Sequence, residues 1–84
     1  MFESENYDNY NNRIIETIHH DFYTSYELVK DSINGYYVNL HSKQDKKRVI
    51  IAKFGSINND DNSDFYFASL FWNVIKIKNQ EDTK

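Results

Sequence analysis

The stretch SDFYFASLFWNVIKIK, residues 63–78, is the densest run of apolar side chains in the chain. As a strand it would present apolar side chains on both faces, and both faces would need cover. The polar residues in and just after it instead step by four, three and four, which is the spacing of one helical face: Ser69, Asn73, Lys76 and Gln80. We therefore predict an apolar C-terminal helix here, with a third β-strand as the alternative. Either element must be covered on more than one side.

The first part of the chain also shows helical spacing. Apolar side chains recur every three or four residues, at Tyr7, Tyr10, Ile14, Ile18 and Phe22. This pattern predicts an amphipathic helix over about residues 6–20, with polar and charged residues on its solvent side.

A second helix is predicted over residues 24–33, because a capping-box pattern of Thr and Glu opens it. It would end at Asn34-Gly35, since glycine adopts the left-handed conformation just past a helix without a Cβ clash. The competing interpretation makes this dipeptide a tight turn between two strands. Leu28 and Val29 are adjacent and apolar rather than alternating, which favours the helix.

Two later segments, residues 36–42 and 48–54, have the composition of strands. Tyr36, Val38 and Leu40 would share one face of the first segment. The polar residues 43–47 between the segments form a turn, so the pair predicts an antiparallel β-hairpin over about residues 36–54.

These elements together predict an α+β fold with N-terminal helices, the hairpin and the apolar C-terminal helix. A chain of 84 residues makes one small domain over residues 1–84, with frayed ends at about 1–5 and 80–84. The absence of cysteine excludes disulfides, thiol nucleophiles and thiolate metal sites, so packing or self-association must stabilise the fold.

The chain contains no run of 18 apolar residues, and residues 1–10 lack the basic and apolar regions of a secretory signal. We therefore expect a cytoplasmic protein that is soluble and has no membrane contact. The abundance of Asn, Ile, Lys and Tyr is typical of an AT-rich genome, such as that of a low-GC bacterium or its phage.

Charge is distributed unevenly along the sequence. Residues 1–35 carry seven acids and two bases, a net charge of −5, whereas residues 36–57 carry five bases and one acid, a net charge of +4. The cations gather at the turn of the predicted hairpin: Lys43, Lys46, Lys47 and Arg48. Such a tip could contact phosphates, so a nucleic-acid-binding module is our alternative function. The acidic pI of about 5.5 argues against nucleic-acid binding, because the chain lacks a positive overall electrostatic field.

Catalytic and metal-binding groups do not assemble in the sequence. His19, His20 and Asp21 are adjacent, and Glu16 precedes His20 by one helical turn, so these side chains could supply metal ligands, but a third ligand, such as His41, would have to come from elsewhere. With two glycines and no cysteine there is no phosphate-binding loop and no Cys-His pair. We expect no catalytic residues, no metal, no cofactor and no enzymatic activity.

Aromatic residues make up 17% of the chain, more than so small a domain can easily enclose. Surface aromatics commonly anchor interfaces, so we predict a non-enzymatic interaction protein that docks onto a protein partner, with a homodimer as one form. A regulator or inhibitor encoded by a phage or other mobile element fits the size and composition. The predicted partner-binding residues are Tyr36, Tyr37, Phe65 and Trp72.

Overall fold

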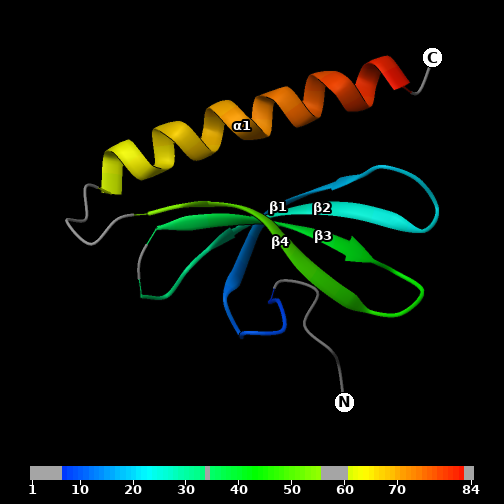
Figure 1. The fold of residues 1–84 in the computed structure, drawn as a ribbon, viewed down its shortest axis with the longest axis horizontal. Coiled ribbons are helices and arrows are strands. Elements are labelled where there is room, and N and C mark those ends of the chain that lie inside the picture. The colour runs from blue at the N-terminus through cyan, green and yellow to red at the C-terminus, as the bar shows by residue number, and fades with distance from the viewer. Residues whose placement is uncertain (1–6, 34, 56–60, 83–84) are drawn as a thin grey trace.

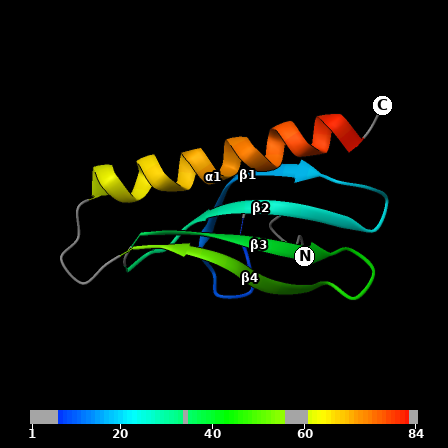
Figure 2. The same cartoon turned by 45° about the horizontal axis from the view of Figure 1, so that its top comes forward.

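The computed structural model describes residues 7–33, 35–55 and 61–82, and these form one sheet and one helix (Figure 1). The sheet is antiparallel and its strands follow chain order: β1 (Arg13–His19), β2 (Thr24–Lys30), β3 (Tyr36–Ser42) and β4 (Lys47–Phe54). Helix α1 (Asp61–Asp82) then lies across one face of the sheet (Figure 2). The α+β class is therefore confirmed, whereas the N-terminal helices are wrong and the hairpin is half of a four-stranded sheet.

The first predicted helix fails because of an irregularity in β1. The pairing of β1 with β2 shifts register between Ile14 and Glu16, which adds an extra residue to the strand. Ile14 consequently packs on one face of the sheet with Val29, while Ile18 packs on the other face, toward α1. Ile14 and Ile18 thus have the four-residue spacing of a helical stripe, but they lie on opposite faces of the sheet.

The second predicted helix is strand β2, and the competing interpretation was right that strands lie on both sides of this turn, although residues 31–35 rather than a tight dipeptide connect them. Leu28 packs under α1 and Val29 packs on the opposite face, so a strand covered on both faces needs no alternation. Gly35 has a φ of 76°, and a Cβ there would lie 2.2 Å from the carbonyl oxygen of Phe54. Glycine is required at that position both by the backbone conformation and by the closeness of β4. Asn34 lies outside the described residues.

The hairpin prediction is confirmed, since β3 and β4 pair antiparallel from Tyr36↔Phe54 to Ser42↔Lys47. A second register shift, between Val38 and Asn39, makes Ile51 an extra residue in β4. This shift breaks the simple alternation expected for residues 48–54.

The C-terminal helix is confirmed and the strand alternative is wrong. Helix α1 crosses the sheet obliquely: Phe65 contacts Tyr36 on β3, and Lys76 reaches Glu16 on β1. Its Ala68 and Trp72 complete an apolar core with β2 and β3. Residues 80–82, expected to fray, are helical, while residues 1–5 and 83–84 lie outside the described part of the chain.

Candidate functional site

The side of α1 that faces away from the sheet is apolar. Its exposed large side chains have between 46% and 60% of their surface accessible, and we call them the apolar ridge: Tyr66, Phe67, Leu70, Val74 and Ile77. The rings of Tyr66 and Phe67 lie against each other with centroids 5.5 Å apart. The polar line expected to face solvent includes Lys76, which forms an ion pair of 2.8 Å with Glu16 of β1. Lys76 therefore lies on the flank of α1, while the exposed Asn73, one turn from Leu70 and Ile77, is a polar residue beside the ridge.

The four predicted partner-binding residues do not share a surface. Trp72 and Tyr37 are each only 2% exposed, Trp72 on the side of α1 that packs on the sheet and Tyr37 on the opposite face of the sheet. Tyr36 is partly buried, with the ring of Phe65 5.4 Å away and the ammonium group of Lys30 4.8 Å from its centroid. Phe65 keeps 48% of its surface exposed. The apolar ridge was missed because helical spacing does not reveal which side of a helix meets the sheet.

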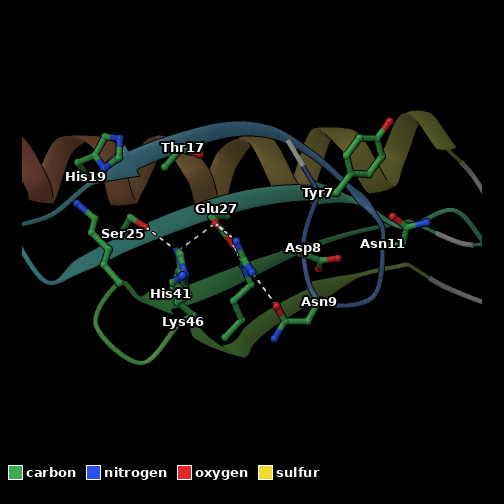
Figure 3. A pocket seen from close by; sticks show the side chains of 12 residues that line it. Tyr7, Asp8, Asn9, Asn11, Thr17, His19, Ser25, Glu27, His41 and Lys46 are labelled. Atoms are coloured by element: carbon green, nitrogen blue, oxygen red, sulfur yellow. Dashed lines mark hydrogen bonds and ion pairs between the residues drawn. The ribbon is translucent and has the colours of Figure 1, made fainter. Parts of the chain in front are cut away.

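A hollow of about 710 Å³ opens on the face of the sheet opposite α1 (Figure 3). All four strands contribute to this polar hollow, together with the turn before β1. Its lining is polar and includes Asp8, Thr17, His19, Ser25, Glu27, His41, Lys46 and Arg48. This polar hollow is therefore chemically the reverse of the apolar ridge.

Asp8 fastens the turn before β1 to the polar face of the sheet. One carboxylate oxygen, Oδ1, accepts hydrogen bonds from the backbone N–H groups of Tyr10 and Asn12, both at 3.0 Å. The other, Oδ2, accepts from the hydroxyl of Tyr37 and from Nδ2 of Asn39. The Asp8 side chain therefore closes the turn and ties it to β3. Asp8 is buried, with 7% of its surface exposed.

The same contacts shift two pKa values in opposite directions. Burial raises the pKa of the Asp8 carboxyl, but the hydrogen bonds from Tyr37, Asn12 and other donors outweigh burial and hold it below its usual value. Burial, reinforced by the Asp8 carboxylate, raises the pKa of the Tyr37 hydroxyl well above its usual value. The pair is thus fixed as carboxylate and neutral phenol near neutral pH.

Glu27 is a buried carboxylate that is held by a cation. Arg48 donates from Nε to Oε1 at 2.7 Å and from Nη2 to Oε2 at 3.1 Å. His41 lies beside the same carboxylate, with Nδ1 3.4 Å from Oε2. Burial lowers the pKa of His41, and the charge of Arg48 adds to this effect, so His41 is neutral at pH 7.

Ser25, His41 and Glu27 superficially resemble a catalytic triad. In a triad the serine and the acid use different nitrogens of the imidazole ring. Here Ser25 Oγ, at 3.5 Å, and Glu27 both approach Nδ1. Ser25 is also only 2% exposed. The group can join strands β2 and β3 by hydrogen bonds, but it lacks the geometry for nucleophilic attack.

Three of the four residues of the predicted basic tip, Lys43, Lys46 and Arg48, line the polar hollow. Arg48 points into the polar hollow and is neutralised by Glu27, while its Nη1 donates to Asn9 at 2.7 Å. Lys43 donates from Nζ to the backbone carbonyl of Asp21 at 3.0 Å. Lys46 lies at the rim of the hollow with a φ of 58°, and Lys47 begins β4 in an exposed position. The basic tip thus contributes to the polar hollow, where Arg48 is neutralised by Glu27, while Lys47 is not part of the lining.

The two adjacent histidines considered as metal ligands lie in different surroundings. His19 lines the polar hollow, while Nδ1 of His20 lies 2.9 Å from Oδ1 of Asn79 on α1. Among residues 7–33, 35–55 and 61–82, no three His, Asp or Glu side chains gather as a metal-binding group.

Comparisons with protein-family models, with curated proteins and with solved structures gave no match to this chain. Within the described residues, α1 is too polar to cross a membrane. The surfaces of the molecule themselves are thus the basis for inferring function.

Proposed function

We propose that this protein is a non-enzymatic interaction protein that docks onto a protein partner through the apolar ridge of α1. One observation carries the proposal: five large apolar side chains on one side of a helix are each about half exposed. Contiguous apolar patches of this kind are uncommon on monomers and mark interaction surfaces. The small size of the chain, and an amino-acid composition typical of an AT-rich genome, fit a cytoplasmic regulator or inhibitor from a phage or other mobile element of a low-GC bacterium.

The apolar ridge is suited to helix packing rather than to small-molecule binding. It is a raised surface on a regular helix, so a partner must supply a groove or another helix. From Phe65 to Ile75 the sequence of α1 contains no charged residue, so a partner would not need to desolvate a charge on the ridge. In the polar hollow, by contrast, the charged side chains Glu27 and Arg48 already bind each other.

Comparing matched variants for binding would test this proposal. The double variant Leu70→Glu/Val74→Glu places two charges on the ridge, whereas Phe22→Glu/Ile33→Glu places two charges on residues that are 85% and 88% exposed elsewhere. The wild-type chain and the control should bind the same protein, first by co-purification from the native host and then by calorimetry with that protein purified. Equal binding by the ridge variant would contradict the proposal.

A further inference from the structure

The apolar ridge has the spacing of a surface that pairs with a copy of itself. Four of its residues follow one another at steps of three, four and three, as in the seam of a coiled coil: Phe67, Leu70, Val74 and Ile77. We infer that the partner of the ridge is a second copy of this chain, bound by antiparallel pairing of the two α1 helices. This inference rests on the proposed function, because it names the partner of the same surface.

The helix dipoles favour the antiparallel arrangement, because opposite ends of the two α1 helices become neighbours. The exposed Lys78 adds to this preference, since parallel pairing would set it beside the same lysine of the second copy. Asp64 is only 8% exposed and Lys76 is paired with Glu16, so neither charge takes part in the contact. An antiparallel contact between two identical helices is two-fold symmetric.

The area of the ridge matches what such a contact needs. Its two half-exposed aromatic side chains offer about 100 Å² each, and its three aliphatic side chains together offer about 200 Å². The resulting apolar area of about 400 Å² approaches the apolar share of the roughly 800 Å² that each partner buries in a standard interface. The ridge thus supplies most of the apolar area that a small dimer interface needs.

The two-fold axis follows from the spacing. A midpoint between Leu70 and Val74 sets Leu70 opposite the partner's Val74, and Phe67 opposite the partner's Ile77. Helix packing of this kind requires the helix axes to approach to about 8–10 Å. Among the elements drawn in Figures 1 and 2, none lies on the outer side of α1 that would prevent this approach.

Light scattering and sedimentation over a dilution series of the full chain test the dimer. The wild-type chain and the Phe22→Glu/Ile33→Glu control should show the mass of two chains at high concentration and that of one chain on dilution. The Leu70→Glu/Val74→Glu variant should raise the dissociation constant at least 100-fold. Circular dichroism and thermal unfolding of that variant verify that it is folded.

The orientation is tested by disulfide formation, which the natural chain cannot provide because it contains no cysteine. Phe67→Cys and Ile77→Cys proteins are mixed and oxidised, and the disulfide-linked species are identified by mass. Antiparallel pairing predicts mainly the mixed disulfide, since it places the two positions opposite each other. Two copies of the same cysteine would lie about 15 Å apart along the helix, too far for a disulfide.

A chain that stays monomeric up to millimolar concentration overturns the self-pairing, as does a dimer that the ridge variant leaves unchanged. Predominance of disulfides between identical cysteines also overturns it. The proposed function fails under a different condition, namely when neither a second copy nor any other protein depends on the ridge. A monomer that binds another protein through Leu70 and Val74 would therefore refute the inference alone.

Discussion

The two faces of the sheet are packed by opposite chemistry. Under α1, Leu28, Val38 and Trp72 form an apolar core, whereas the other face adds buried Asp8 and Glu27, with their hydrogen-bond donors, to a smaller apolar cluster around Val29. Apolar burial stabilises without fixing direction, while buried charges tolerate only the geometry that satisfies them. The apolar face should therefore supply most of the folding free energy, and the polar face should fix strand register and make stability depend on pH.

The largest effect is expected from Trp72→Ala, which empties the centre of the apolar face. Loss of a buried aromatic side chain costs about 3–5 kcal/mol. An 84-residue domain has about 4–13 kcal/mol of stability in total, so the variant should be largely unfolded. Urea denaturation followed by circular dichroism measures this, since Trp72 is the sole tryptophan reporter. The control Phe22→Ala, at an 85% exposed ring, should change stability by less than about 0.5 kcal/mol.

A somewhat smaller loss is expected when the buried ion pair of the polar face is broken. Glu27→Leu leaves the guanidinium of Arg48 without its carboxylate, at a cost of about 3 kcal/mol. Adding Arg48→Met should recover much of this loss, because an apolar pair replaces two buried charges. The exposed pair of Lys76 and Glu16 provides the contrast, since Glu16→Ala should cost under about 1 kcal/mol. Equal losses at the two pairs would contradict the distinction between the faces.

The contrast also explains which parts of the fold could be predicted from the sequence. The β3–β4 hairpin and α1 follow from local periodicity, because each keeps a regular repeat over most of its length. The N-terminal strands do not, because the register shift at Ile14 and Glu16 and the two-sided burial of β2 produce spacings that imitate helices. The β-branched residues of β1 favour a strand, but the prediction gave more weight to the helical spacing of the apolar residues.

The candidate sites were predictable to different extents. An apolar helix with too few polar residues signals an exposed or doubly covered surface, although its orientation depends on tertiary packing. The polar hollow gives no local signal, because Asp8 and Asn39 are 31 residues apart and meet only when β3 lies beside the first turn. From the sequence we assigned Arg48 to the surface cations of the basic tip. Its partner Glu27 was not predictable from local pattern, because β2 and β4 are two strands apart in the sheet.

The hydrogen bond from Tyr37 to Asp8 should give stability a dependence on pH at both extremes. The pKa of Asp8 is lowered by folding, so its contribution is lost as the pH falls below about 3.8. The pKa of Tyr37 is raised by folding, so its contribution is lost as the pH rises above about 10. Tyr37→Phe should cost about 1–2 kcal/mol at pH 7 and should weaken both dependences, as measured by urea denaturation across pH.

A smaller dependence is expected near neutral pH from His41. Its pKa is lowered in the folded chain, so protonation favours the unfolded state and stability should decrease as the pH falls below about 6.5. His41→Gln removes the titrating group, and its unfolding free energy should be nearly constant between pH 7 and pH 5. A wild-type chain that is equally stable at these two values would show that His41 is not coupled to folding.

The smallest effect is expected from substitutions in the basic tip, the candidate site for the alternative function, nucleic-acid binding. Arg48 is engaged by Glu27 and Lys43 by the backbone carbonyl of Asp21, so phosphates would compete with partners inside the chain. Three phosphate contacts would reduce affinity about 40-fold between 50 and 200 mM salt, and four about 150-fold. The chain carries a net charge of −3, so we expect weak oligonucleotide binding that Lys46→Glu/Lys47→Glu changes less than about twofold. A salt dependence near 40-fold, abolished by that variant, would instead make the polar face a binding surface and replace the ridge as the functional site.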